Sequence, residues 1–546
     1  MSLTPFLLAL RDLRVSVANS TTPLLGPLDL DLVAGECLAI VGESGAGKSL
    51  TTLALLGLLP PQLHAGGSLR VDGRDIPLGS REHIALRGRT LAWVPQDALA
   101  ALHPLRSVGA QLRETLRHAG IARDGIRSEA LALLERVELP AADALLARYP
   151  HELSGGQRQR VCIALALATR PRCLLADEPT SALDPRVGRG ILNLLDTLRR
   201  DLGLALLLVS HDLPLVATLA QRVLVLHRGR CVETGTTAQV FAAPNAPYTR
   251  ELLAAEHLDS APPAQSGALL LSANDLAVRY PRATRDALAP TTIALHRGEC
   301  LALVGESGSG KSTLARAVLR LLRTPTRGRI VLDGVDIEAL GARALRPLRR
   351  RIGVVFQDPY ASLDPRQTAA QIIAEPLRIH GVGDSTQRRE RAAELMRVVG
   401  LDANTMDTAP MDRYPHQFSG GQCQRIAIAR ALATDPELLV CDEAVSALDA
   451  RSRAAILQLL ARLKIERGLA LLFITHDLDA ARALADRIAV MQDGKIVETG
   501  AAGDVLSAPQ HPYTRELLAA RPAALAASRY RVCTGSGEPL SSSAAR

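Results

Sequence analysis

The stretch Gly42-Glu43-Ser44-Gly45-Ala46-Gly47-Lys48-Ser49 decides the fold of this 546-residue chain, and a near copy, Gly305-Glu306-Ser307-Gly308-Ser309-Gly310-Lys311-Ser312, lies in its second half. Both stretches have the glycine-rich spacing, closed by Lys-Ser, in which backbone N–H groups cradle phosphates. An apolar run precedes each loop, at Cys37–Val41 and Leu301–Val304. A helical pattern follows each loop, at Ser49–Leu59 and Ser312–Leu322. This strand–loop–helix order predicts an α/β protein with one nucleotide site in each half.

Lysine usage supports the same interpretation. The chain has 64 basic residues, of which only four are lysines, and two of those four are Lys48 and Lys311. A phosphate loop needs a compact ammonium that reaches the phosphates, and the planar fork of arginine does not replace it. Lysine is thus kept at these two positions in a chain that uses arginine almost everywhere else.

Length and composition bound the remaining possibilities. A chain of 546 residues is too long for one core and suits two domains, and a hydrophobic fraction of 47% is enough to fill them. The net charge of +8 is typical of an arginine-rich solvated surface, and it only weakly favours a nucleic-acid or membrane surface. The apolar runs Leu202–Val209 and Leu469–Ile474 are much shorter than the ~20 residues of a membrane helix. Any membrane function therefore requires partner chains.

The two halves are copies of one domain. Matching positions recur in the same order, ending with Pro247–Ala255, which returns at Pro512–Ala520. We expect a first domain at residues 4–255, a short polar linker at 256–268 and a second domain at 269–525. The Ser-, Ala- and Gly-rich segment 526–546 is expected to be disordered. Helix-favouring segments at Val108–Ala147 and Ala369–Val399 indicate a helical insert on each α/β core.

Two carboxylates follow a buried-strand pattern in each half. They are Asp177-Glu178 after Cys173–Ala176, and Asp442-Glu443 after Leu438–Cys441. Downstream of a phosphate loop, the aspartate is expected to hold Mg²⁺ together with the Ser49 or Ser312 hydroxyl, and the glutamate to act as general base. The structural alternative is a simple helix cap at the end of a strand.

A Ser-Gly-Gly-Gln motif precedes a helical pattern in each half, as Ser154-Gly155-Gly156-Gln157 and Ser419-Gly420-Gly421-Gln422. Free N–H groups, a hydroxyl and the positive end of a helix dipole suit an anion. The alternative is a capped helix after a flexible turn. A glutamine and a histidine complete the ordered set in each half, at Gln96, His211, Gln357 and His476.

This ordered set, present twice, resembles the ATPase subunits of ATP-binding-cassette (ABC) proteins over nearly the whole chain. The resemblance implies two tandem P-loop ATPase domains, each with a RecA-like α/β core, an antiparallel β lobe and a helical subdomain. It also implies that the domains pair head to tail around ATP and Mg²⁺. The first site is then expected to combine Lys48, Ser49, Gln96, Asp177, Glu178 and His211 with Ser419, Gly420, Gly421 and Gln422. The second is expected to combine Lys311, Ser312, Gln357, Asp442, Glu443 and His476 with Ser154, Gly155, Gly156 and Gln157.

Within that resemblance, individual residues take expected roles. The glutamines match the loop that senses the metal and contacts the permease, and the histidines match a γ-phosphate contact. Asp184 and Asp449, in Ser-Ala-Leu-Asp, match a segment that crosses between cassettes. The family stacks adenine on an aromatic residue near the end of the first strand. The second half offers Tyr280 there and the first half Val17, so we expect weaker adenine binding in the Lys48 site.

Finer motifs are similar to one branch of the family, the bacterial dipeptide, oligopeptide and nickel importers, in a fused form. The motifs are Gln357–Arg366, Phe418–Arg425 and the repeated Pro-Tyr-Thr-Arg-Glu-Leu-Leu. This resemblance implies a motor on the cytoplasmic face of the bacterial inner membrane, with two integral permeases and a periplasmic solute-binding protein as partners. Peptide, glutathione, nickel chelate and peptide antibiotic are all compatible solutes. Cys533 is the sole cysteine of the tail, and we predict no iron–sulfur cluster there.

A soluble tandem ABC ATPase that acts on ribosomes or nucleic acid is the main alternative. Such translation factors typically join their cassettes by a long charged helix, whereas residues 256–268 are short and rich in proline and alanine. DNA-repair relatives carry zinc-binding cysteine pairs, and the eight cysteines here include no C-x-x-C pair. A regulatory ATPase without a transport partner is a third possibility.

Overall fold

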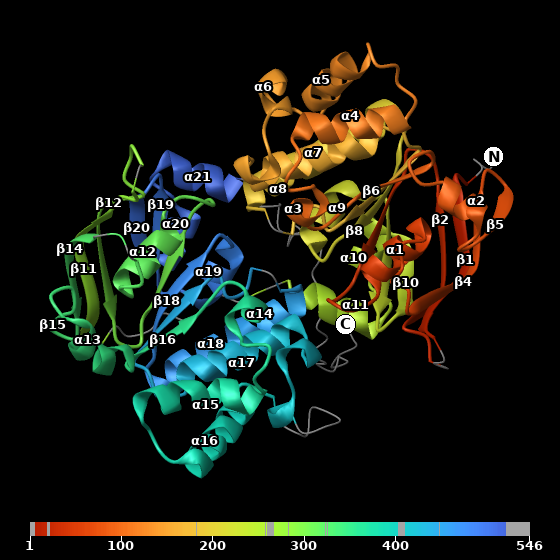
Figure 1. Cartoon of the computed structure of the whole chain (residues 1–546). Helices are drawn as coiled ribbons and strands as arrows, with labels where there is room; N and C mark the ends of the chain where they lie inside the picture. The colour runs from red at the N-terminus through yellow and green to blue at the C-terminus, as the bar shows by residue number, and fades with distance from the viewer. Residues whose placement is uncertain are drawn as a thin grey trace, which may run out of the picture.

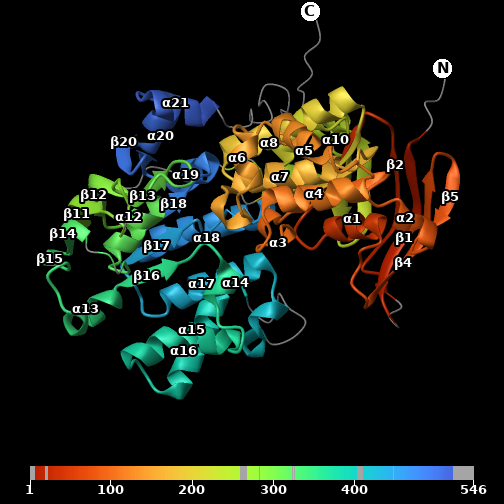
Figure 2. The same cartoon turned by 45° about the horizontal axis from the view of Figure 1, so that its top comes forward.

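The computed structural model describes residues 6–18, 22–181, 183–256, 258, 267–281, 283–322, 324, 326–401, 410–446 and 448–519. The expected disordered tail, Cys533 and most of the linker lie outside these residues. The chain forms two similar halves whose antiparallel β lobes lie at the two far ends of the molecule (Figures 1 and 2).

Each half contains two sheets. In the first half a four-stranded sheet has the order β2-β1-β4-β5 and a six-stranded sheet the order β10-β9-β3-β8-β7-β6. The strands are β1 Leu8–Val17, β2 Leu25–Leu32, β3 Cys37–Val41, β4 Leu63–Val71, β5 Arg74–Pro77, β6 Leu91–Val94, β7 Cys173–Asp177, β8 Ala205–Val209, β9 Arg222–His227 and β10 Arg230–Thr236. Strands β6, β7, β8, β3 and β9 are parallel, and β10 adds an antiparallel edge.

The helices of the first half cover this core and form its insert. They are α1 Lys48–Leu56, α2 Arg81–Ala85, α3 Ala98–Ala101, α4 Val108–His118, α5 Ile126–Arg136, α6 Ala142–Leu146, α7 Gly155–Leu167, α8 Pro185–Leu202, α9 Leu213–Leu219, α10 Thr237–Ala242 and α11 Pro247–Ala254, with a 3₁₀ turn at Pro150–Glu152. Helices α4 to α6 pack with α7 to form the predicted helical subdomain.

The second half repeats this plan, with sheet orders β12-β11-β14-β15 and β16-β17-β18-β13-β19-β20. Its strands are β11 Leu269–Val278, β12 Leu288–His296, β13 Cys300–Val304, β14 Thr326–Leu332, β15 Val335–Asp336, β16 Ile352–Val355, β17 Leu438–Asp442, β18 Ala470–Thr475, β19 Arg487–Gln492 and β20 Lys495–Ala501. Its helices are α12 Lys311–Val318, α13 Ala342–Arg349, α14 Pro359–Ser362, α15 Ala369–His380, α16 Ser385–Val398, α17 Gly420–Leu432, α18 Ala450–Arg467, α19 Leu478–Leu484, α20 Ala502–Ser507 and α21 Pro512–Ala519, with 3₁₀ turns at Pro410–Asp412 and Pro415–Gln417.

The central strands are apolar because both of their faces are covered. Every residue of β3, β7, β8, β13, β17 and β18 is buried, which confirms the buried parallel strands predicted from the uninterrupted apolar runs. The thiols of Cys37 and Cys300 lie in this core, where burial raises the pKa of Cys37 to about 12. These cysteines therefore pack as small apolar side chains.

The helices after the phosphate loops end earlier than the apolar pattern predicts. Helix α1 stops at Leu56 because Gly57 takes a left-handed conformation, with φ 60°, and caps it. Helix α12 stops at Val318, and Arg320 has φ 50°. In both cases the apolar residues beyond the helix lie on an irregular connection to the β lobe.

Candidate nucleotide sites

The phosphate loops connect β3 to α1 and β13 to α12, at the carboxyl edge of each parallel sheet. Gly42 has φ 152°, and a Cβ at this position would lie 2.2 Å from the carbonyl oxygen of Leu226. The counterpart Gly305 has φ 154°, and its Cβ would lie 2.3 Å from Met491 O. Backbone conformation and close approach together require glycine here. The loop can then turn tightly into the first turn of the helix.

The loop lysines are buried and directed at their own loops. Lys48 Nζ donates to Gly42 O and Glu43 O, both at 2.9 Å. Lys311 Nζ donates to Gly305 O at 2.7 Å and Glu306 O at 2.8 Å. Burial lowers the pKa of Lys311, although nearby carboxylates oppose this shift. Each ammonium therefore lies inside a concave, N–H-rich loop, as the sequence predicts for a phosphate cradle.

A serine–aspartate pair lies beside each loop. Ser49 Oγ donates to Asp177 Oδ1 at 3.2 Å, and Ser312 Oγ donates to Asp442 Oδ1 at 3.0 Å. Burial raises the pKa of Asp177 to about 6 and shifts that of Asp442 in the same direction. Mg²⁺ prefers oxygen ligands such as a hydroxyl and a carboxylate. Each serine–aspartate pair therefore fits Mg²⁺.

The next residue, Glu178 or Glu443, receives the other polar groups of its site. Gln96 Nε2 donates to Glu178 Oε2 at 3.0 Å, and Gln357 Nε2 donates to Glu443 Oε2 at 2.8 Å. The same two glutamates have positive φ values, 44° and 50°. Non-glycine residues pay a conformational cost there, and such strain concentrates at functional sites.

A histidine approaches each glutamate from the end of β8 or β18. His211 Nδ1 lies 3.2 Å from Glu178 Oε2, whereas His476 Nδ1 lies 3.5 Å from Glu443 Oε2 without hydrogen-bond geometry. Burial opposes ionisation of Glu178, but its contacts with His211 and Lys48 outweigh burial and lower the pKa of the carboxyl. The first glutamate is thus an ionised acceptor, as a general base must be.

The Ser-Gly-Gly-Gln motifs begin α7 and α17 as capped helices. Ser154 Oγ accepts from Gln157 N at 3.3 Å and Gln157 Oε1 accepts from Ser154 N at 3.0 Å, and Ser419 and Gln422 repeat this box. Each motif therefore forms the capped helix that the sequence offered as the alternative to an anion site. A capping box does not prevent anion binding, because the N–H groups of the glycines still point out of the helix.

The cavities beside the two loops show what each half contributes to the other. The first is lined by Lys48, Ser49, Gln96, Glu178 and His211, with Asp449 from the second half. The second is lined by Lys311, Ser312, Gln357, Glu443 and His476, with Asp184 from the first half. The crossing aspartates thus reach the opposite sites, as predicted from the resemblance.

The expected meeting of each loop with the opposite Ser-Gly-Gly-Gln motif is not made in the described chain. None of residues 154–157 lines the second cavity and none of 419–422 lines the first, while Gly420 lines the cavity of its own half. The halves meet instead through α8 and α18: Asp449 Oδ2 accepts from Ser44 N at 3.4 Å. Bringing the motifs together requires a further approach of the two halves.

Two arginines at matching positions also cross between the halves. Arg451 Nη1 donates to Glu43 Oε1 at 3.1 Å, and Arg186 Nη1 donates to Glu306 Oε1 at 3.2 Å. These symmetric contacts join the first turns of α8 and α18 to the opposite phosphate loops. The sequence analysis did not identify either arginine. Each lies two positions after a crossing aspartate, but this spacing indicates an interface contact only once the halves are known to pair.

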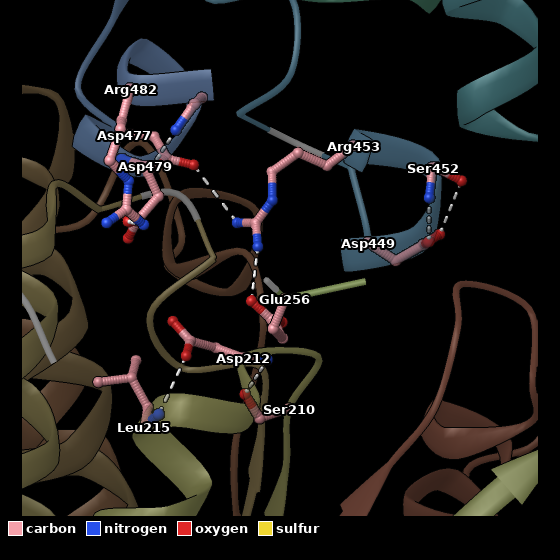
Figure 3. Close-up of polar contacts among 11 residues, drawn as sticks. Ser210, Asp212, Leu215, Glu256, Asp449, Ser452, Arg453, Asp477, Asp479 and Arg482 are labelled. Carbon is pink, nitrogen blue, oxygen red and sulfur yellow. Dashed lines mark hydrogen bonds and ion pairs between the residues drawn. The ribbon is translucent and has the colours of Figure 1, made fainter. Parts of the chain in front are cut away.

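A third interface arginine, Arg453, lies where the first half has Gly188; the neighbouring Arg189 of the first half instead donates to Ala519 O of the second half at 3.0 Å. Arg453 of α18 binds Glu256 Oε2 through Nη2 at 2.7 Å and lies 3.4 Å from Asp477 Oδ2 through Nη1 (Figure 3). Asp477 caps α19 directly after His476, and the matching Asp212 lies across the cluster. Burial raises the pKa of Glu256 to about 7, against the attraction of Arg453. Position 188, which corresponds to Arg453, is glycine.

Tyr280 lies next to the second phosphate loop. Its hydroxyl is 3.5 Å from Oγ1 of Thr313, a residue in the first turn of α12 that lines the second cavity. Val17, in the matching position, is 41% exposed at the end of β1. An aromatic side chain thus lies beside the second phosphate loop, whereas the matching position in the first half is an exposed valine.

No helix in the described ranges combines the length and the apolar character needed to cross a membrane. This agrees with the short apolar runs noted in the sequence.

Comparisons with known proteins give the same outline. A family model described as ABC transporter matches residues 25–181 and 288–446, and one described as the C-terminal region of oligopeptide/dipeptide transporters matches 232–265 and 497–543. The chain is 44% identical to the glutathione import ATP-binding protein GsiA of Escherichia coli (strain K12), covering 91% of this chain and 86% of that protein. It is 43% identical, with the same coverage, to GsiA of Salmonella typhimurium (strain LT2). A solved structure of the ATP-binding cassette MJ0796, a dimeric post-hydrolysis state bound to ADP and Pi, matches with 31% identity and a TM-score of 0.39, covering 43% of this chain and 99% of that one.

Proposed function

This chain belongs to the ABC transporter family as a tandem ATP-binding ATPase subunit, and we propose that it powers uptake of a peptide or peptide-like solute through separate permease subunits. The observation that carries the proposal is the transporter C-terminal match after each ATPase match, on a chain with two full sets of catalytic side chains. The relatives named above are glutathione import proteins, which makes glutathione the first solute to test.

The comparisons support this interpretation and not the ribosomal or nucleic-acid alternative, because both family models and both curated relatives are transporter proteins.

In the proposed mechanism each site hydrolyses ATP with its own glutamate. Glu178, or Glu443, accepts a proton from water as the water oxygen bonds to the γ-phosphorus and the bond from that phosphorus to the ADP oxygen breaks. Gln96 and His211 converge on Glu178 Oε2, which orients the carboxylate toward that water. Lys48 binds the phosphates, and Gln357 and Lys311 have the same roles in the second site, where His476 Nδ1 lies 3.5 Å from Glu443 Oε2.

Ser49, Gln96 and Asp177 are the residues we propose to hold Mg²⁺ in the first site, and Ser312, Gln357 and Asp442 in the second. When bound, Mg²⁺ supplies positive charge that offsets the charge on the phosphates. The Ser49 hydroxyl, 3.2 Å from Asp177 Oδ1, supports this assignment, because a hydroxyl and a carboxylate are oxygen ligands of the kind that Mg²⁺ takes.

The second half of each site is proposed to arrive by closure. Ser154–Gln157 would then face the Lys311 loop and Ser419–Gln422 the Lys48 loop, so that ATP binds both halves and hydrolysis releases them. The contacts of Asp184 and Asp449 with the opposite sites support a rotation about the existing interface. We propose that this motion is passed to two integral permeases, with a solute-binding protein on the other side of a bacterial inner membrane.

The test is to isolate the full chain from its own membranes in mild detergent and identify the proteins that come with it, with membranes from a strain lacking the chain as control. Two multi-spanning permeases are the expected result. Ribosomal proteins or RNA in their place would overturn the importer function and leave the ATPase standing. With permeases in hand, vesicles containing the complex should accumulate glutathione or a short peptide only when ATP is supplied on the side of this chain.

A further inference from the structure

The repeated Pro-Tyr-Thr block has a place in the structure that its sequence does not suggest. It begins α11 and α21, the last described helix of each half. Tyr248 Oη accepts a hydrogen bond from the backbone N–H of Glu43 at 3.1 Å, and Tyr513 Oη accepts from the N–H of Glu306 at 3.0 Å. Glu43 and Glu306 are the second residues of the phosphate loops. Two segments about 200 residues apart thus make the same contact twice, with sequence separations of 205 and 207.

Both tyrosines are held firmly enough to act as fixed acceptors. They are 8% and 6% exposed, and the ring of Tyr248 stacks on His227 with centroids 3.9 Å apart and planes 4° apart. Burial raises the pKa of Tyr248 to about 12, which keeps its hydroxyl neutral at physiological pH. A neutral, buried phenol can still accept one hydrogen bond, and here the loop N–H supplies it.

The turn before each helix is tied to the sheet beside the loop. The Glu233 carboxylate of β10 accepts from Asn245 N at 2.8 Å and Ala246 N at 3.1 Å. In the second half, the Glu498 carboxylate of β20 accepts from Gln510 N at 2.8 Å and His511 N at 3.0 Å. Each tyrosine is therefore anchored to the strand hairpin that flanks the phosphate-loop strand, and not only to its own helix.

We propose that Tyr248 and Tyr513 are positioning residues that hold the first turn of each phosphate loop in its phosphate-binding conformation. The loop turns at Gly42 or Gly305, in a conformation that only glycine adopts readily, so the next N–H needs a partner to keep the turn in place. The phenol supplies that partner from outside the loop and leaves the inner N–H groups free for phosphate. The C-terminal region that marks this transporter branch thereby acts on ATP binding. The proposal rests on ATP binding by the loops, not on the solute or the permeases.

Tyr248→Phe and Tyr513→Phe, made singly in the full chain, test the proposal because they remove the hydroxyl and keep the ring. We expect the KM for ATP to rise about 5- to 20-fold, the range set by an N–H left without its acceptor, while kcat stays within about twofold. The rise in melting temperature on adding ATP should shrink in parallel, since that rise depends on ATP affinity. The melting temperature without nucleotide should change little.

Tyr149→Phe and Tyr414→Phe are matched controls, since these tyrosines are 41% and 40% exposed and stack on the exposed side chains of His151 and His416. They should leave the KM for ATP unchanged. An unchanged KM in both test variants would overturn the proposal. A lower melting temperature without nucleotide, combined with an undiminished ATP-induced rise, would also overturn it, because the hydroxyl would then stabilise the helix alone. Failure of solute uptake in vesicles leaves this result untouched, so the two proposals are tested separately.

Discussion

The two halves of the molecule carry the same catalytic side chains but differ in what surrounds them. Each half has a loop lysine, a serine–aspartate pair, a glutamate with positive φ and a glutamine that contacts it. The serine–aspartate and glutamine–glutamate distances in the two halves agree within a few tenths of an ångström. Around them, the second half has Tyr280 and Arg453 where the first has Val17 and Gly188. The two halves thus share their catalytic side chains, whereas residues beside the phosphate loops and at the interface have diverged.

The interface difference makes the contacts between the two halves unequal. Arg453 joins the end of the first half, at Glu256, to Asp477 beside His476, and glycine at position 188 cannot make the reverse contact. The first half reaches the second half differently, through Arg189, which donates to Ala519 O at 3.0 Å.

The largest effect should come from removing the two glutamates. We expect Glu178→Gln and Glu443→Gln each to lower kcat for ATP about 10²- to 10⁴-fold, the usual contribution of a general base, while ATP binding is retained. Steady-state ATPase activity and equilibrium ATP binding should be measured side by side on both variants.

Equal losses would mean that the halves hydrolyse as one unit despite their different surroundings. Unequal losses would assign the greater share of turnover to one site. Full ATPase activity in either variant would contradict the catalytic role of that glutamate.

Removal of Arg453 should have the next largest effect. Arg453→Gln leaves Glu256 and Asp477 without their shared cation, and breaking such a buried pair costs about 3 kcal/mol. The free energy of unfolding of the full chain, from urea titration, should fall by about this amount. Arg462→Gln, an arginine of the same helix that is 51% exposed, is the control and should cost much less. Equal effects of the two substitutions would mean that the Arg453 cluster contributes nothing specific.

Glu256 should make stability depend on pH. Its pKa is about 7 in the folded chain, above the ordinary 4.5, so the folded state holds this proton more tightly than the unfolded state. Its contribution to the free energy of unfolding is therefore largest below about pH 4.5, declines as pH rises to about 7, and is constant above that.

Glu256→Gln should remove that decline, so wild type should lose about 3 kcal/mol more than the variant between these limits. Urea titrations of both proteins across this range give the difference directly, in which the titration of Asp177 and other shared groups cancels. Parallel curves would show that Glu256 ionises normally beside Arg453.

The aromatic difference should affect nucleotide affinity by a smaller amount. Base–aromatic stacking contributes ~1–3 kcal/mol in nucleic-acid complexes, and a single exchange at an open site should fall at the low end of that range. Tyr280→Val should weaken ATP binding at the second site about tenfold, and Val17→Tyr should strengthen it at the first. Binding of ATP to each variant in the Glu178→Gln, Glu443→Gln background measures affinity without turnover. If ATP affinity is unchanged in both variants, adenine stacking does not distinguish the two halves.

The sequence was sufficient for features that depend on neighbours along the chain. Apolar runs predicted β3, β7, β8 and their copies, and the loop spacing predicted where Lys48 and Ser49 lie, because strand, loop and helix follow one another within a few residues. The helix after each loop was predicted too long, since Gly57 and Arg320 end or redirect it through backbone conformations that apolar periodicity does not encode.

Contacts between distant segments were beyond that reasoning. The bond between Tyr248 and Glu43 joins residues separated by a whole domain, and the arginine cluster exists only because the two halves meet. The positive φ of Glu178 is likewise a backbone conformation that a glutamate in the sequence does not indicate. The resemblance correctly indicated that Asp184 and Asp449 cross between the halves, but it could not give the separation of the Ser-Gly-Gly-Gln motifs from the opposite loops, which depends on how far the halves have closed.

Substitution of the crossing arginines, Arg451 and Arg186, should have the smallest effect on the interface. It also compares matching positions of the two halves directly. Arg451 is 53% exposed and Arg186 is 63% exposed, and solvent-exposed ion pairs of this kind contribute about 0.2–1 kcal/mol. Arg451 also lies 3.6 Å from Glu251, a second carboxylate, so Arg451→Gln should weaken the interface more than Arg186→Gln. Cross-linking yield between cysteines placed across the interface, measured at low salt and at 1 M salt, reports the change for each variant. High salt should abolish the difference between the variants, because screening removes exposed ion pairs first. A difference that survives 1 M salt would show that the two halves are held by packing around these arginines and not by their charge.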